Sequence, residues 1–229
     1  MSVEVLIMPR FPQAIAQRGS QKWLQILVNR RPELLERLIH ERLGSQHDRI
    51  QWVSPVEKDD YAEYRDRSFI ERLDVKLEKV SLESYWPLGG PRWDALGRTE
   101  DSEVFLVEAK SHIEELISTL RARDDSSKNK IRGSLDKIRG FMNGRNDVDW
   151  ASGFYQYANR LAHLYLLREL NGLRAYLVFI YFTNDPDMGR HSEAEWKGAI
   201  RLVKSYLGID RHRLERYVAD IFVDTSILA

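Results

Sequence analysis

WDALGRTEDSEVFLVEAK, residues 93–110, is the stretch that decides the fold. Two short apolar segments stand on either side of the polar turn TEDSE, a pattern that predicts a β-hairpin. Val104 to Val107 are apolar without interruption, so we expect the second strand to be covered on both faces. Alternate residues of a strand share a face, so Glu108 and Lys110 should project together while Ala109 turns into the core.

The same hairpin carries a candidate catalytic group: Asp94 on its first strand, with Glu108 and Lys110 on its second. Two or three carboxylates plus a backbone carbonyl suit a hard cation such as Mg²⁺ or Mn²⁺. Such an ion polarises a phosphate and activates water, and Lys110 would orient that water or stabilise charge on the phosphate. The alternative is an ordinary salt bridge on a half-exposed strand. The position at the end of an apolar run favours the first interpretation, because charges buried there are costly unless they are paired.

The rest of the chain alternates helical and strand patterns, which predicts an α/β protein with a mixed central sheet flanked by helices. Beyond the hairpin, the expected strands are residues 3–8, 49–53, 173–182 and 217–223. The expected helices are one capped by Ser20, one from Pro32 to Gly44, and residues 57–73, 113–121, 126–142, 149–171 and 192–207. We divide the chain into a helical extension, residues 1–55, packed on a core domain, residues 56–229.

Composition excludes several classes of protein. With no cysteine among 229 residues, disulfides, thiolate zinc sites and a cysteine nucleophile are ruled out. The six histidines do not form the HExxH spacing of a helical zinc site. No apolar run is long enough for a membrane helix and the start of the chain does not resemble a signal peptide, so a cytoplasmic protein is expected. The net charge is zero, so any basic surface for nucleic acid must be local.

Asp94 followed by the Glu108-Ala109-Lys110 triplet resembles the motif of the PD-(D/E)XK nuclease superfamily, which has the restriction-endonuclease-like fold. The resemblance covers about residues 57–182. It implies that Asp94 and Glu108 bind Mg²⁺ or Mn²⁺ and that Lys110 acts on the attacking water. Trp93 stands where the family often has proline, and Pro91 lies three residues before Asp94. Some family members add a glutamate ligand from the first helix; Glu63 and Glu71 are available, and we favour Glu63.

The segment 149–171 is apolar nearly all round, apart from a narrow polar strip of Gln156, Asn159, Arg160 and His163. YQYANR is similar to the pattern of such nucleases, which often place a Gln and nearby polar residues on the helix after the ExK strand. Gln156 and Arg160 would then orient a phosphate or steady the active-site carboxylates. The alternative is a strip that meets solvent or a neighbouring loop, and for His163 this structural interpretation is favoured.

A basic segment, residues 121–145, holds eight basic and three acidic residues. If Ile131, Leu135, Ile138 and Met142 form the buried side of its helix, the lysines and arginines must be largely exposed. Lys128, Lys130 and Arg132 are therefore candidates for contact with a phosphate backbone, with Ser126 and Ser127 as possible caps. The alternative is an ordinary solvated face.

These observations favour a metal-dependent nuclease that acts on DNA, with RNA as the alternative substrate. A homodimer is one assembly that fits this hypothesis. One alternative is a catalytically inactive nuclease-fold protein that serves as a nucleic-acid-binding or assembly module. Another is an unrelated α/β interaction protein in which the Glu-Lys pair is a surface ion pair. Convergence of Asp94, Glu108 and Lys110 on one open point would favour the enzyme.

Overall fold

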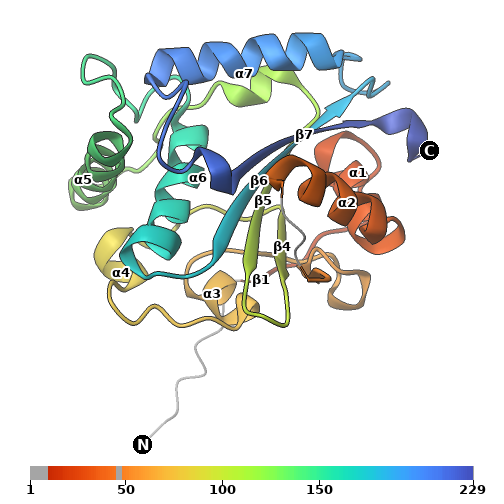
Figure 1. Cartoon of the computed structure of the whole chain (residues 1–229), viewed down its shortest axis with the longest axis horizontal. Coiled ribbons are helices and arrows are strands. Elements are labelled where there is room, and N and C mark those ends of the chain that lie inside the picture. The colour runs from red at the N-terminus through yellow and green to blue at the C-terminus, as the bar shows by residue number, and fades with distance from the viewer. Residues whose placement is uncertain (1–9, 45–47, 229) are drawn as a thin grey trace, which may run out of the picture.

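A five-stranded mixed sheet forms the centre of the molecule, for which a computed structural model describes residues 10–44 and 48–228. The strand order is β2-β4-β5-β6-β7 (Figure 1). β2, β4 and β5 are antiparallel neighbours, whereas β6 and β7 continue the sheet in parallel from β5. The strands are β2 (Gln51–Ser54), β4 (Ala95–Arg98), β5 (Val104–Lys110), β6 (Ala175–Thr183) and β7 (Val218–Asp224). The expected α/β class with a mixed central sheet is therefore confirmed.

The predicted hairpin is β4 and β5, in which Ala95 faces Val107 and Arg98 faces Val104. Its turn is closed by Thr99, whose backbone N–H donates to the carbonyl of Glu103 and whose hydroxyl accepts the N–H of Glu103. All of β5 is buried, as its uninterrupted apolar run predicted. The expected strand at residues 3–8 lies outside the described residues.

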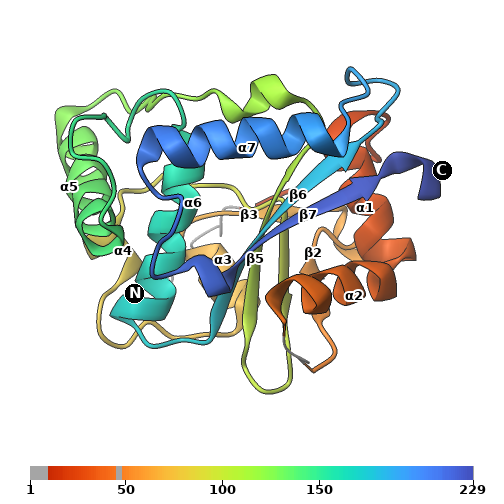
Figure 2. The ribbon, with the colours of Figure 1, turned by 45° about the horizontal axis from the view of Figure 1, so that its top comes forward.

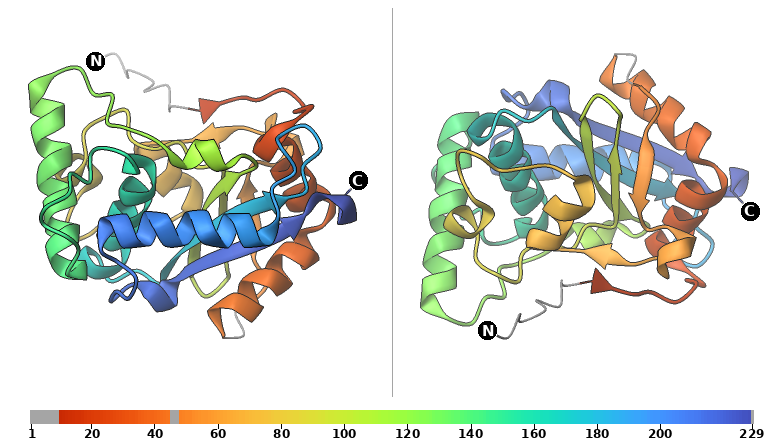
Figure 3. Two further views of the ribbon diagram at one scale, coloured as in Figure 1. Left: turned by 90° about the horizontal axis from the view of Figure 1, so that it is seen from above. Right: turned by 90° about the horizontal axis from the view of Figure 1, so that it is seen from below.

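One face of the sheet is covered by α1 (Gly19–Arg30) and α2 (Pro32–Leu43), as Figure 3 shows. Their apolar side chains pack on alternate residues of the central strands and form one of two core clusters, with Trp23, Leu24, Leu27, Leu35, Ile39, Phe105, Val107, Ala109, Val178 and Ile180 among its members. The start of the second helix at Pro32 and its end at Gly44 are confirmed. The expectation that Ser20 caps the first helix is wrong: the cap is Arg18, without a side-chain bond, because Gly19 already lies in the helix.

The other face carries α6 (Tyr155–Tyr165) and α7 (Glu193–Leu207), and α5 (Asp125–Met142) packs against α6. In Figure 2, α7 and α2 lie on opposite sides of the sheet. α6 begins later than the predicted residue 149 and continues into a π-helical turn, Leu166–Leu170. The predicted helix over residues 192–207 is confirmed as α7, and Ser192 caps it by forming a capping box with Glu195.

The predicted charged helix over residues 57–73 is wrong in its first half. Residues 57–59 form one 3-10 turn, and Glu63–Tyr64 is a short strand, β3, that pairs with β1 (Arg10–Phe11). The helix α3 begins only at Arg67 and ends at Leu73. Asp60, Tyr61 and Asp66 have positive φ angles, which interrupt a helix.

The predicted helix over residues 113–121 is also wrong. Only Ile113–Leu116 forms a 3-10 turn, and a short helix, α4, lies earlier, at Leu82–Tyr85. From Ser118 the chain is extended, because its backbone bonds to a distant segment: the N–H of Ser118 donates to Gly153 and that of Leu120 to Ala151. Among the described residues, no helix is long and apolar enough to cross a membrane.

Candidate active site

The hairpin brings Asp94 beside the Glu108-Ala109-Lys110 triplet. The N–H of Asp94 donates to the carbonyl of Val107, and its Oδ2 accepts the N–H of Ala109 at 2.8 Å. Ala109 belongs to the core cluster under α1 and α2, so Glu108 and Lys110 share the opposite face of β5. The alternation predicted from the sequence is therefore present.

Glu108 is a fully buried carboxylate held between two cations. Its side chain is 2% exposed, with Lys110 Nζ 2.5 Å from Oε1 and Arg160 Nε 2.6 Å from Oε2. Burial acts to raise the pKa of Glu108, but the charges of Arg160 and Lys110 outweigh it and lower that pKa. Burial likewise acts to lower the pKa of Lys110, and Glu108 and Asp94 reverse this effect. Glu108 and Lys110 are therefore both charged in the folded protein.

The negative charges of Asp94 and Glu63 are less well balanced by neighbouring cations than that of Glu108. Burial and the neighbouring Glu108 raise the pKa of Asp94 well above its ordinary value. Burial is also the main cause of the raised pKa of Glu63, against which Arg92 acts from 3.6 Å. The two carboxylates border a cavity of about 20 Å³, together with Gln21 and Ala109. A space of that size holds one water molecule.

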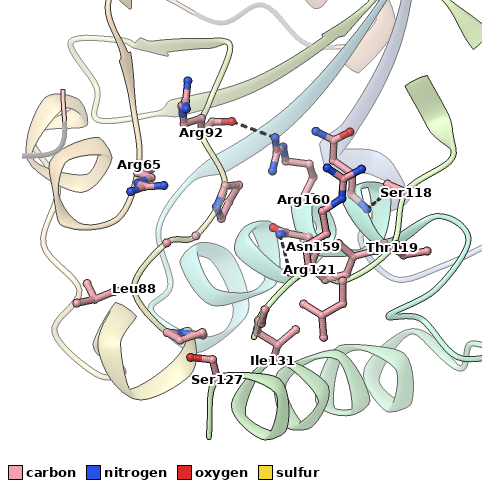
Figure 4. Close-up of a pocket in the computed structure, with 18 of the residues that line it drawn as sticks. Arg65, Leu88, Arg92, Ser118, Thr119, Arg121, Ser127, Ile131, Asn159 and Arg160 are labelled. Carbon is pink, nitrogen blue, oxygen red and sulfur yellow. Dashed lines mark hydrogen bonds between the residues drawn. The ribbon is translucent and has the colours of Figure 1, made fainter. Parts of the chain in front are cut away.

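Asp94, Glu63 and Lys110 line one open cleft with a volume of about 790 Å³. Figure 4 shows Arg65 and Leu88 on one side of it and Ser118, Thr119 and Arg121 on the other, with Asn159 and Arg160 between them. The cleft therefore lies between the loop that precedes β4 and the extended segment after β5. α6 contributes its floor.

α6 places Arg160 against the hairpin because nearly its whole surface is buried. Arg160, 4% exposed on its side chain, also donates to the carbonyl of Arg92 and lies 4.9 Å from the centre of the Trp93 ring. The next turn of the helix carries His163, which is packed among Trp86, Trp93 and Phe69. Burial lowers the pKa of His163 to about 3, so this side chain is a neutral core residue, as favoured from the sequence.

The other sequence candidates divide between the cleft and the outer surface. Gln156 lines the cleft, and its backbone N–H is bound by the hydroxyl of Ser118. Glu71 pairs with Arg67 on α3 and does not line the cleft. Glu63 does line it, from the short strand β3 rather than from a helix.

Lys128, Lys130 and Arg132 lie on α5 and do not line the cleft, and each has a partner within the protein. Lys128 bonds to Asp125, Lys130 to the carbonyl of Glu83, and Arg132 makes two bonds to Asp149. Their role in nucleic-acid binding stays a prediction. The expected serine caps of α5 are wrong, because Asp124 is the cap and accepts the N–H of Ser127.

Sequence reasoning missed three arginines of the cleft: Arg65, Arg92 and Arg121. The guanidinium groups of Arg65 and Arg92 both lie near the ring of Phe11, at 4.7 and 4.2 Å from its centre. Their only signal in the sequence is closeness to Glu63 and Asp94. The contact with Phe11 depends on the pairing of β1 with β3, which the residue pattern does not reveal.

The donor set fits a hard divalent cation only in part. Across residues 10–44 and 48–228, no three acidic or histidine side chains already stand as a metal-binding group. Asp94 and Glu63 nevertheless face a common small cavity with raised pKa values, so added positive charge would stabilise both. Glu108 is engaged by Lys110 and Arg160. The residues that fit such an ion are therefore Asp94 and Glu63, with oxygen ligands of the kind that Mg²⁺ and Mn²⁺ prefer.

No protein family, curated protein or solved structure matches this chain. The chemistry that the site supports follows from the side chains that line it. Carboxylates and a lysine at one end of an arginine-lined cleft suit a substrate that is an anion and a reaction in which negative charge develops.

Proposed function

We propose that the protein is a metal-dependent nuclease of the restriction-endonuclease-like fold that hydrolyses phosphodiester bonds in nucleic acid, DNA in the first instance. The observation that carries the proposal is the convergence of Asp94, Glu63 and Lys110 on the wall of one cleft, with Glu108 directly behind them. The order of the β4–β5 hairpin, the helix α6 with its polar strip, and the parallel strand β6 is similar to the order that the family resemblance of the sequence implies.

Each group has a role that its position supports. Asp94 and Glu63 would hold Mg²⁺ or Mn²⁺, which when bound lowers the pKa of water and polarises the phosphate. Lys110 keeps its proton and is placed to donate it as a hydrogen bond to a phosphate oxygen. Glu108 fixes the ammonium of Lys110, and Arg160 fixes Glu108, so both positioning contacts are independent of substrate.

The electrostatic character of the cleft supports a polyanionic substrate. The chain as a whole is neutral, and this cleft is lined by Arg65, Arg92, Lys110, Arg121 and Arg160 beside the acidic Glu63, Asp94, Glu115 and Asp124. Guanidinium groups bind phosphate through paired hydrogen bonds, and such contacts position a nucleic-acid backbone without reading its sequence.

One observation favours a second function, a nucleic-acid-binding module without catalysis. Both oxygens of Glu108 already have cationic partners, Lys110 and Arg160. A carboxylate held in this way is a weaker metal ligand than a free one, because binding the ion would require it to give up a partner. If the protein has this second function, the cleft binds nucleic acid, and the contacts of Glu108 with Lys110 and Arg160 only stabilise the fold.

A cleavage assay separates the two functions. Wild-type protein and the Lys110→Ala variant are incubated with single-stranded, duplex and branched DNA in Mn²⁺, beside Lys76→Ala, which removes an exposed lysine that does not line this cleft. A nuclease requires cleavage by the wild type and by Lys76→Ala, and a loss of about 100-fold or more in Lys110→Ala. Equal cleavage by all three would identify a contaminant. No cleavage by the wild type, with binding retained, would establish the binding module.

A further inference from the structure

The cleft is also lined by side chains that the hydrolysis of a phosphodiester bond does not require. Next to the carboxylates and arginines, the same cleft is lined by the apolar side chains of Leu88, Ile117 and Ile131, and by the amide of Asn159. In Figure 4, Ile131 lies on the far side of Asn159 from Arg92, whereas Leu88 lies beside Arg65 on the wall opposite Ser118 and Thr119. The cleft therefore combines charged and apolar lining residues, with the amide of Asn159 among them.

Asn159 is a buried polar group with an unfilled hydrogen-bonding position. The residue is 5% exposed; its Nδ2 donates to the hydroxyl of Tyr155, and its Oδ1 has no partner in the described part of the chain. A buried amide atom without a partner costs about 1–3 kcal/mol. The two ends of an amide can be exchanged in place, so the open position can accept or donate a hydrogen bond. A ligand with donors and acceptors on one edge would fill it.

Two apolar side chains stand unusually exposed at the walls of the cleft. Leu88 is 80% exposed and Ile117 is 68% exposed. Their backbones are fixed rather than free. The loop that carries Leu88 is tied to Asp66, which accepts the N–H groups of Gly89 and Gly90, and the segment after Ile117 bonds to residues 151–153. Preformed apolar walls of this kind suit a flat ring, whose faces gain contact while its edge keeps its hydrogen bonds.

We propose that the cleft binds one unpaired nucleobase of a single-stranded nucleic acid. The base edge bonds to the amide of Asn159, and one face lies on Leu88. This proposal rests on the proposed function in taking nucleic acid as the ligand, and it adds the substrate class. A base inside a duplex has its pairing edge engaged and its faces stacked, so it cannot reach a buried amide. The attached phosphates lie toward the arginines of the cleft, Arg65, Arg92 and Arg121.

The test is binding without metal, so that it does not depend on cleavage. Fluorescence anisotropy in EDTA measures the affinity for labelled oligothymidylate and oligouridylate of about 12 nucleotides, a blunt hairpin duplex, and an abasic strand of the same length. The expected result is affinity for both single strands about tenfold or more above that for the duplex and the abasic strand, because stacking and one base-edge bond contribute together. Equal affinity for the abasic strand and oligothymidylate overturns the proposal. A preference for the duplex overturns it as well.

Two variants assign the effect to the cleft. Asn159→Leu should weaken binding of oligothymidylate about fivefold to tenfold, and leave the abasic strand unchanged. Leu88→Ser, a surface change that spares the core, should weaken oligothymidylate several-fold, whereas Leu202→Ser on α7, also an exposed leucine, should not. An equal loss on base-containing and abasic strands would show that these residues act only on the fold or on phosphate, and would overturn the proposal. Base-dependent binding without cleavage in Mn²⁺ would instead remove the nuclease function and leave the base site standing.

Discussion

The buried contact between Arg160 and Glu108 is the interaction on which the interior of the site depends most. Arg160 is the cation on Glu108 Oε2, and both side chains are almost wholly out of solvent. Removal of one member of a buried pair leaves the other charge uncompensated, which costs more than the pair contributes when intact.

We therefore expect Arg160→Met to lower the free energy of unfolding by about 3 kcal/mol, even though Lys110 still pairs with Glu108. The double variant Arg160→Met with Glu108→Gln should lose less stability than the sum of the two single variants, because the contact between Arg160 and Glu108 can be lost only once. Urea unfolding of the wild type, both single variants and the double variant measures the coupling. Strictly additive effects would show that the two residues do not stabilise each other.

His163 gives the fold an acid sensitivity that can be measured apart from activity. Its Nδ1 lies 3.0 Å from the carbonyl of Asn159, which only accepts, so Nδ1 carries the proton of the neutral ring. Burial lowers its pKa from 6.5 to about 3 in the folded protein. The unfolded chain therefore binds more protons between these values, and stability falls as the pH is lowered through this window.

The expected contribution of His163 is a loss of about 2 kcal/mol in unfolding free energy between pH 6.5 and 4.5. His163→Leu should flatten the dependence of the urea midpoint on pH over this range, whatever it does to the midpoint at pH 7. Some dependence should persist in the variant, because burial also lowers the pKa of His212, to about 4. An unchanged slope would mean that His163 is protonated in the folded state.

Among the helices and strands, those that could be predicted are the ones whose structure depends on residues close to one another in the sequence. The β4–β5 hairpin joins two apolar runs across one polar turn, so its register and the shared face of Glu108 and Lys110 follow from strand alternation. The errors have long-range causes. Residues 118–120 are extended because they bond to residues 151–153, and Glu63 reaches the site because Tyr64 bridges to Trp93. Arg160 meets Glu108 across 52 residues, a pairing that helical periodicity cannot reveal.

The basic residues lie on different elements, which leads to a prediction about how the affinity for nucleic acid depends on salt concentration. Arg121 is exposed and lines the cleft, and Arg65, whose Nε lies 3.4 Å from Asp66 Oδ2, lines the same wall as Leu88. Lys128 and Lys130 on α5 already have oxygen partners within the protein. Because Arg65 and Arg121 line the same cleft as the candidate catalytic groups, contacts with phosphate should come mainly from this cleft, although both lysines were candidates from the sequence.

Each phosphate contact with a single strand contributes about 0.7 to the slope of log K against log salt concentration. We expect Arg65→Gln with Arg121→Gln to reduce that slope by about 1.4 for oligothymidylate, and Lys128→Gln with Lys130→Gln to change it by less than about 0.7. Anisotropy titrations over a series of NaCl concentrations in EDTA provide the slopes. A larger change for the α5 pair would place the nucleic-acid interface on that helix instead.

For the molecule as a whole, the sheet needs both of its helical layers. Phe105, Val107, Val178 and Ile180 point from β5 and β6 into the cluster completed by α1 and α2. Without these helices, a broad apolar face of a central sheet would meet water, at a cost of roughly 25 cal/mol for each Å² exposed. In addition, β2, within the predicted extension at residues 1–55, pairs with β4. The division of the chain at residue 55 stays a prediction, but the first 55 residues contribute both a helical layer and a strand.

A truncated chain that begins at Ile50 keeps β2 and loses α1 and α2, so it isolates the contribution of the helical layer. We expect it to lack cooperative urea unfolding and near-ultraviolet circular dichroism, and to bind a dye for exposed apolar surface, because the sheet has lost one of its two cores. Leu35→Ala in the full chain, a fully buried position on α2, should cost about 2–5 kcal/mol and remain folded, which separates loss of one side chain from loss of the layer. A truncated chain that unfolds cooperatively with an intact aromatic spectrum would show that residues 50–229 form an independent domain, and that α1 and α2 are an addition to it.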